Sequence, residues 1–144
     1  MATDTNSATT DTHQMQIRVR YCEVDQMGFL HHANYFNYFE MGRTELFRAA
    51  GGNYAELESR GFFLVIVKVE CQYKASARYD DVLTLTTRLV RATGAKLEHE
   101  YHVHRDGELL TVGRSIIACV DRQGQVQRID DALLFGADRP ADSA

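Results

Sequence analysis

The sequence is poor in proline and cysteine and lacks a long apolar run. Its single proline, Pro140, lies near the C-terminus, and its three cysteines are Cys22, Cys71 and Cys119. An odd number of cysteines without C-x-x-C spacing suits a reduced chain better than a secreted, disulfide-linked one. No stretch approaches the roughly 18 apolar residues that a membrane-spanning helix needs, and the N-terminus has no basic segment followed by an apolar run. We therefore expect a cytoplasmic protein without an integral membrane segment.

The sequence also lacks a strong excess of either charge. The formal net charge is −4 and the isoelectric point is about 5.8, so no extended basic surface for nucleic acid is expected. Hydrophobic residues make up 44% of the chain and charged residues 25%. These values are typical of a globular domain and exclude a wholly disordered chain, a collagen and a disulfide-rich miniprotein.

The 144 residues suffice for one domain with one sizeable core. Residues 1–14 are almost entirely polar or small, so they bury too little apolar surface to offset the entropy of ordering. Residues 136–144 are also mainly small or acidic. We therefore predict a disordered tail at 1–14, a folded domain at 15–135 and a flexible tail at 136–144.

The pattern of apolar residues changes its period along the chain. Alternation with a period of two predicts strands, and a stripe with helical spacing predicts helices. The expected strands are 16–21, 62–74, 82–92, 96–105 and 109–121, and the expected helices are 34–50, with Asn34 as N-cap, and 53–60. One buried helix followed by strands with short connections predicts an α+β domain, in which a mostly antiparallel sheet of five to six strands wraps around the long helix.

The densest group of polar residues joins the first strand to the long helix. Asp25 precedes Gly28, and His32 stands just before the helix, whose first amides lack partners and carry partial positive charge. A carboxylate near such amides supplies a base or nucleophile together with donors for a developing oxyanion, which acyl transfer requires. On the pattern alone, Asp-x-x-Gly is more often an ordinary turn.

Three segments resemble the hotdog-fold 4-hydroxybenzoyl-CoA thioesterase family, and in particular its Tol-Pal-associated acyl-CoA thioesterase branch. The segments are Tyr21-x-Glu23-x-Asp25-x-x-Gly28, His32-Ala33-Asn34-Tyr35-x-x-Tyr38-Phe39-Glu40-x-x-Arg43-Thr44-Glu45 and Tyr73-x-x-x-Ala77-Arg78-x-Asp80-Asp81-x-Leu83. The resemblance covers about residues 16 to 130. It implies a hotdog fold, homodimers joined sheet edge to sheet edge, commonly paired into homotetramers, and hydrolysis of short-chain aliphatic or aromatic acyl-CoA at the dimer interface.

The resemblance also implies roles for individual residues. Asp25 matches the catalytic aspartate, acting as nucleophile or general base, His32 supplies a backbone amide for the carbonyl oxygen, and Tyr21 assists. The expected substrate-binding residues are Gly28, His31, Ala33, Asn34 and Tyr35. No metal and no retained cofactor are implied, because coenzyme A is part of the substrate.

The sequence departs from the family pattern at two positions. His31 stands where a tyrosine is usual, which leaves the acyl preference open, and Ser76 stands where a proline is usual. Two other functions fit the sequence less well. A hotdog dehydratase or hydratase would carry a Gly-Asp-x-Asn-Pro-x-His-like segment, which is absent. A non-catalytic acyl-thioester binding protein or partner of an envelope-linked assembly is disfavoured by the retained Asp25 and Gly28.

Simpler interpretations apply to several conspicuous side chains. Aromatic residues at helical spacing are usually core, which is the expectation for Tyr35, Phe36, Tyr38 and Phe39. Glu40 and Arg43 form either a buried polar pair or, more commonly for this spacing, a surface pair. No metal site is expected at the histidines of 99–104, because only two of the three share a strand face.

Overall fold

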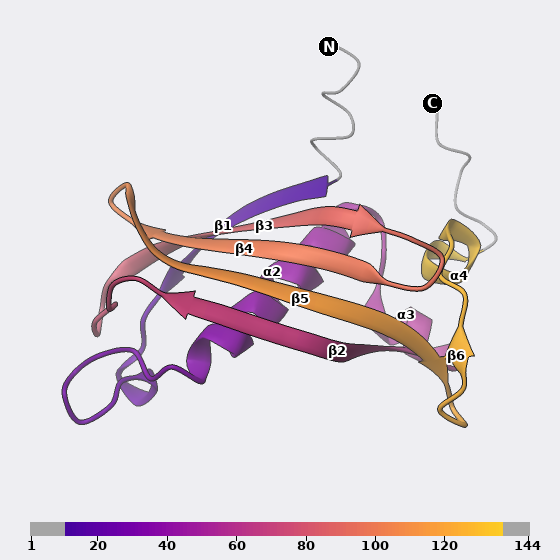
Figure 1. Ribbon diagram of the computed structural model, residues 1–144, viewed down its shortest axis with the longest axis horizontal. Helices are drawn as coiled ribbons and strands as arrows, with labels where there is room; N and C mark the ends of the chain where they lie inside the picture. The colour runs from indigo at the N-terminus through magenta and orange to yellow at the C-terminus, as the bar shows by residue number, and fades with distance from the viewer. Residues whose placement is uncertain (1–10, 137–144) are drawn as a thin grey trace, which may run out of the picture.

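The computed structural model describes residues 11–136 (Figure 1). Residues 1–10 of the predicted N-terminal tail and residues 137–144 of the predicted C-terminal tail lie outside the described residues. The strands are β1 (Thr12–Arg18), β2 (Phe62–Tyr73), β3 (Val82–Ala92), β4 (Leu97–Arg105), β5 (Glu108–Asp121) and β6 (Val126–Gln127). The helices are the 3-10 turn η1 (Tyr21–Glu23), α2 (Asn34–Ala49), α3 (Tyr54–Ser59) and α4 (Asp131–Phe135).

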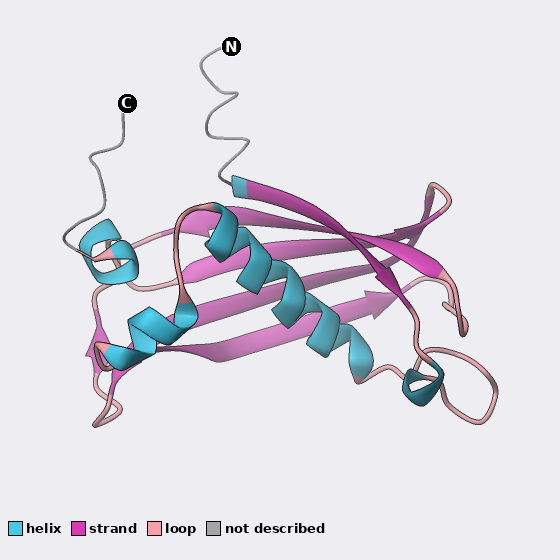
Figure 2. Ribbon diagram, turned by 180° about the vertical axis from the view of Figure 1, so that it is seen from behind, coloured by secondary structure: helices cyan, strands magenta, loops and turns pink. Residues whose placement is uncertain are grey.

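The strands form one antiparallel sheet of six strands. Its order is β1-β3-β4-β5-β2, with β6 paired to the far end of β5. Helix α2 lies across one face of this sheet, and α3 and α4 lie beside its C-terminal half (Figure 2). The side chains that face α2 from β4 are Leu97, His99, Tyr101 and Val103, and all four are buried. The structure therefore confirms the predicted α+β class.

Strand β1 begins earlier than the sequence pattern predicts. Thr12 to Arg18 pair in register with Arg88 to Val82 of β3, so residues 12–14 are part of the sheet. The prediction of a tail through residue 14 is wrong for these three positions. Main-chain hydrogen bonds with a long neighbouring strand order this polar segment, even though its side chains bury little apolar surface.

Helix α2 packs closely on the sheet because it carries a glycine at its centre. A Cβ atom at Gly42 would overlap the side chain of Thr87 and press on Leu85, both in β3. The aromatic prediction holds for Tyr35, Tyr38 and Phe39, which are buried. Phe36 is instead 37% exposed, because it lies on the flank of the helix.

The first turn of α2 differs from the prediction. Ala33, not Asn34, occupies the N-cap position, and no side chain caps the helix. Asn34 is already helical, and its Nδ2 donates to the carbonyl oxygen of Glu23 at 2.9 Å. Its side chain therefore ties the helix to the preceding loop, which explains why asparagine stands at this boundary.

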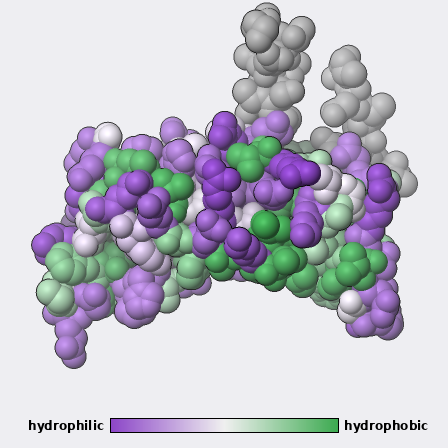
Figure 3. Space-filling view, in the orientation of Figure 1, coloured by the Kyte–Doolittle hydropathy of each residue, from purple (hydrophilic) through white to green (hydrophobic). Residues whose placement is uncertain are grey.

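Strand β2 forms one free edge of the sheet and exposes several apolar side chains beside the charged Lys68 and Glu70. Its exposed large hydrophobic residues are Val65, Ile66, Val67, Val69 and Tyr73. Hydrophobic surface gathers along this edge in the space-filling view (Figure 3). Across the described part of the chain, no helix has the length and apolar character needed to cross a membrane.

Candidate active site

Asp25 is held in a tight loop between η1 and α2. Its main-chain N–H donates to the carbonyl oxygen of Phe29 at 2.8 Å, and its Oδ1 accepts from the amides of Met27 at 2.9 Å and Phe29 at 3.1 Å. Gly28 adopts φ +83°, a conformation that favours glycine. Within the described residues no donor contacts Oδ2, so the loop fixes the carboxylate and leaves one oxygen available.

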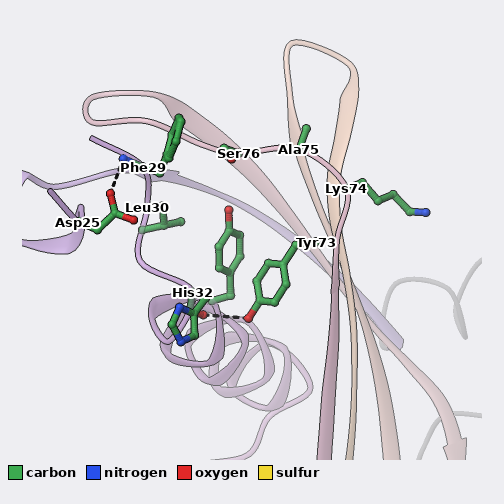
Figure 4. A pocket seen from close by; sticks show the side chains of 9 residues that line it. Asp25, Phe29, Leu30, His32, Tyr73, Lys74, Ala75 and Ser76 are labelled. Atoms are coloured by element: carbon green, nitrogen blue, oxygen red, sulfur yellow. Dashed lines mark hydrogen bonds between the residues drawn. The ribbon is translucent and has the colours of Figure 1, made fainter. Parts of the chain in front are cut away.

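The carboxylate borders a cavity of about 290 Å³ where the loop, the start of α2 and the end of β2 meet (Figure 4). The lining residues are Asp25, Phe29, Leu30, His32, Tyr35, Tyr73, Lys74, Ala75 and Ser76. The structure thus brings together three residues predicted from the sequence, namely Asp25, His32 and Tyr35. Figure 4 shows the amino group of Lys74 pointing away from the cavity.

His32 stands two residues before α2 and lines the cavity at the start of the helix. The amides of Asn34 and Tyr35 donate to the carbonyl oxygens of His31 and His32, at 2.9 and 3.3 Å, and the Ala33 amide donates to Nδ1 of His31 at 3.2 Å. By contrast, the amide of His32 has no acceptor among the described residues. It is therefore the free main-chain donor at this helix start, where the helix dipole adds positive potential.

Two tyrosines close the inner side of the cavity. The ring centroids of Tyr35 and Tyr73 lie 5.1 Å apart, and the Tyr73 hydroxyl donates to the carbonyl oxygen of His32 at 3.1 Å. Burial raises the pKa of Tyr35, and burial together with the neighbouring Cys71 raises the pKa of Tyr73 to about 12. Both hydroxyls are therefore protonated at neutral pH and serve as hydrogen-bond donors.

Glu23 joins the Asp25 loop to α2. Its main-chain oxygen accepts from the His31 amide at 2.9 Å, in addition to the Asn34 side chain. Its Oε1 accepts from the Tyr38 hydroxyl at 2.7 Å and from the Arg20 amide at 2.8 Å. Burial acts to raise the pKa of Glu23, but these hydrogen bonds outweigh it and leave the pKa lowered. The carboxylate thus stays charged and links both sides of the site.

Tyr21 lies apart from the cavity in this single chain. Its side chain is 77% exposed and packs edge-on against Tyr79, with ring centroids 5.6 Å apart. It belongs to η1, the short turn that leads from β1 into the Asp25 loop. The structure therefore does not bring Tyr21 together with Asp25 and His32.

Four predicted substrate-binding residues surround the cavity without lining it. Gly28 shapes the Asp25 loop, and Asn34 turns its side chain toward Glu23. His31 stacks on the ring of His32 with centroids 4.2 Å apart, and Ala33 occupies the helix N-cap. These four residues contact other parts of the chain and support the residues that face the cavity.

The sequence patterns missed the wall that follows β2. Lys74, Ala75 and Ser76 reach the cavity because the next residues pair with the Asp25 loop. Leu30 donates its amide to the carbonyl oxygen of Ala77 at 2.9 Å, and Phe29 forms an isolated bridge with Arg78. These contacts join segments almost 50 residues apart, so local periodicity carries no sign of them. The motif that begins at Tyr73 was the available signal.

Comparisons with known proteins agree with this arrangement. The sequence pattern of the thioesterase-like superfamily matches residues 19–135. YneP of Bacillus subtilis, provisionally named an acyl-CoA thioesterase, is 35% identical over 109 residues, which are 75% of this chain and 79% of YneP. The acyl-CoA thioester hydrolase YbgC of Escherichia coli is 30% identical over 106 residues, or 73% of this chain and 79% of YbgC.

A solved structure, the DHNA-CoA thioesterase of Staphylococcus aureus, superposes with a TM-score of 0.80 at 26% identity and covers 83% of this chain and 81% of that one. The superfamily match at residues 19–135 includes both walls of the cavity, the Asp25 loop and the segment after β2. With the antiparallel sheet around α2, these similarities confirm the expected hotdog fold.

Proposed function

Because the chain belongs to the thioesterase-like superfamily, we propose that it is an acyl-CoA thioesterase, which hydrolyses the thioester of a short-chain aliphatic or aromatic acyl-CoA to the free acid and coenzyme A. The observation that carries the proposal is the shared cavity of Asp25 and the start of α2. A fixed carboxylate and an unpaired main-chain donor are the two groups that thioester hydrolysis needs. The three motifs support a place near the Tol-Pal-associated branch of the 4-hydroxybenzoyl-CoA thioesterase family.

In the proposed reaction, the His32 amide binds the thioester carbonyl oxygen and stabilises the charge that develops on it. The free Oδ2 of Asp25 then acts in one of two ways. As nucleophile it attacks the carbonyl carbon, expels the coenzyme A thiolate and forms a mixed anhydride, which water hydrolyses. As general base it takes a proton from the water that attacks the same carbon, and the resulting tetrahedral intermediate expels the coenzyme A thiolate to leave the free acid. An oxyanion donor contributes about 10²–10³ in rate, and a positioned base about 10²–10⁴.

The remaining parts of the proposal concern substrate and assembly. Coenzyme A enters as part of the substrate, and no metal or retained cofactor takes part. We propose a cytoplasmic homodimer that pairs its β2 edges, with a homotetramer as the further assembly. Tyr21, which lies apart from the cavity of its own chain, would assist only in the assembled protein, and His31 would influence acyl preference through its stacking on His32.

The test is free-thiol release from a panel of short, long and aromatic acyl-CoAs. Asp25→Asn keeps the shape of the side chain, and we expect its kcat/KM to fall by about 10²-fold or more. Asp106→Asn, in the hairpin turn between β4 and β5, is the matched control and should retain full activity because asparagine also tolerates the positive φ there.

Equal activity of wild type and Asp25→Asn would remove Asp25 from the mechanism. If wild type hydrolyses no thioester but binds one, a non-catalytic binding role replaces the enzyme. Mass spectrometry of acid-quenched protein separates the two chemical routes, because only the nucleophilic route leaves an acyl group on the peptide that contains Asp25.

A further inference from the structure

A second cavity, of about 80 Å³, lies between α2, α3, α4 and the inner face of the sheet. Arg43 lines it and stands eight residues after Tyr35 on α2, which places it about 12 Å along the helix axis from the active-site cavity. The other walls are mainly aliphatic and come from all four elements. They include Leu46, Leu64, Leu89, Leu97, Ile117 and Leu134.

Arg43 is a nearly buried cation without a close carboxylate partner. Its side chain is 11% exposed, and its hydrogen-bond partners are the hydroxyls of Tyr101, at 3.4 Å, and of Tyr54. Within the described chain, the one carboxylate within 4.0 Å is that of Glu40, at 3.9 Å, and this side chain is 68% exposed. A guanidinium removed from water is costly unless an anion pairs with it closely. The cavity therefore favours an anionic guest.

His99 adds an independent sign of a missing partner. It is 7% exposed and lines the same cavity, yet its Nδ1 has no hydrogen-bond partner among the described residues. Burial and the nearby Arg43 cation lower its pKa to about 4, so the ring is neutral at pH 7. A neutral imidazole with its proton on Nδ1 offers one N–H to a ligand, and a buried polar nitrogen without a partner is uncommon.

We propose that this cavity binds the carboxylate of a short aliphatic acid, with Arg43 and His99 contacting the carboxylate and the aliphatic walls contacting the chain. A planar carboxylate matches the fork of the guanidinium, whereas an inorganic anion would leave the apolar walls without a partner. The volume is about half that of a 150 Å³ cavity known to hold benzene, which limits the acid to roughly four carbon atoms.

The binding site itself is independent of the proposed enzyme activity. Only its suggested role in binding the reaction product rests on that proposal, because the acid released from a short-chain acyl-CoA belongs to this ligand class. The site would then bind the product at a distance from Asp25, on the same helix that supplies the His32 amide. Binding can be measured without any turnover, so failure of one proposal is distinguishable from failure of the other.

The test is a titration of the full-length protein with butyrate, followed by NMR of the histidine side chains. We expect saturable shifts of the His99 resonances and an increase in its pKa, since a bound anion favours the charged imidazole. Butyramide, which has the same shape without the charge, should bind at least tenfold more weakly. This comparison uses the wild type and does not depend on whether a variant folds.

Two variants locate the site. Arg43→Met should weaken butyrate binding at least tenfold, and Glu40→Gln, which removes the competing exposed carboxylate, should leave it unchanged or strengthen it. Equal binding of butyrate and butyramide would overturn the proposal. Shifts confined to the residues around Asp25 and His32 would also overturn it, because they would place the acid in the active-site cavity.

Discussion

Glu23 connects the Asp25 loop to helix α2 without contacting the active-site cavity itself. Its carboxylate accepts from Tyr38 of α2 and from the Arg20 amide that precedes η1. Its main-chain oxygen also accepts from His31. Because Asp25 follows two residues later, these contacts fix the distance between the proposed catalytic carboxylate and the helix start. We regard Glu23 as a positioning residue.

Glu23→Gln tests this role. We expect a loss of about 1–3 kcal/mol in unfolding free energy, since a neutral carbonyl would replace the charged acceptor of Tyr38 and the Arg20 N–H, and an NH2 group would face the Arg20 guanidinium. We also expect a fall in kcat larger than any change in KM. Arg20→Gln is the control. It removes an exposed ion pair and should cost at most about 1 kcal/mol. Urea unfolding and steady-state kinetics measure both effects, and equal losses in the two variants would contradict the assignment.

The same residue predicts a pH dependence. The pKa of Glu23 is lower in the folded protein than its ordinary value of 4.5, so its contribution is complete above that pH and disappears as the pH falls through the folded value. The stability difference between wild type and Glu23→Gln should therefore be constant from pH 6 to 8 and shrink below pH 4.5. A difference that persists unchanged at pH 3 would refute this interpretation.

His99 differs from Glu23 because the fold keeps its side chain neutral rather than charged. Its pKa of about 4 lies below the ordinary value of 6.5, so unfolding takes up a proton between these pH values. Stability should fall as the pH is lowered from 6.5 to 4, by at most about 3 kcal/mol from this residue. Urea unfolding of His99→Leu should show a shallower dependence across this window, and identical slopes would exclude the effect.

At the scale of elements, periodicity predicted strands β2 to β5 and helices α2 and α3, whereas β1 starts four residues earlier than predicted and the short β6 was missed. Strand β4 alternates buried and solvent-facing residues as its sequence predicts. Helix α4 was missed because it is only five residues long, and its N-cap Asp130 resembles any turn aspartate. The start of α2 was misjudged because Asn34 uses its side chain on Glu23, a contact that sequence spacing does not reveal.

The active site was predictable only where its residues lie close together in the sequence. Asp25 and His32 lie within eight residues of each other, so one local segment and its family resemblance identify both. The wall formed by Lys74, Ala75 and Ser76 depends on pairing between distant segments, and only the folded chain shows it. Tyr21 is the reverse case, since closeness in sequence to Asp25 did not bring it to the cavity.

The loop around Asp25 supplies a further prediction. Gly28 and Gly124 have nearly the same backbone conformation, φ +83° and +79°, and a Cβ would meet no atom within 4 Å at either position. Alanine at either site should therefore cost a similar backbone strain of about 1–2 kcal/mol. Only Gly28→Ala should lower kcat, because it displaces the Asp25 carboxylate. Thermal unfolding and thiol release compare the two, and equal activities would show that the loop geometry is not needed.

At the scale of the whole molecule, the free β2 edge stands out. A long edge strand with exposed apolar side chains is a template for pairing, and soluble proteins normally cover or interrupt such an edge. Pairing of β2 with a second copy would cover residues 65–69 and extend the sheet. It would also bring the second chain near Tyr73, which lies at the end of β2 and lines the cavity.

Val67→Lys tests this pairing. Val67 is 52% exposed at the middle of β2, and a charge there should convert the dimer to a monomer. Val90→Lys is the matched control, since Val90 is 39% exposed on β3, away from the free edge. Light scattering coupled to size exclusion gives the mass of each. A monomeric wild type, or a dimeric Val67→Lys, would contradict the proposed assembly.

The close contact of Gly42 with β3 sets the distance between helix α2 and the sheet. One end of α2 borders the active-site cavity and the other borders the cavity of Arg43, so the height of the helix above the sheet sets the width of both. A larger residue at position 42 would push the helix away from Thr87 and so widen both cavities together. Acyl-chain range and affinity for short acids would then vary in concert, through a position that touches neither ligand.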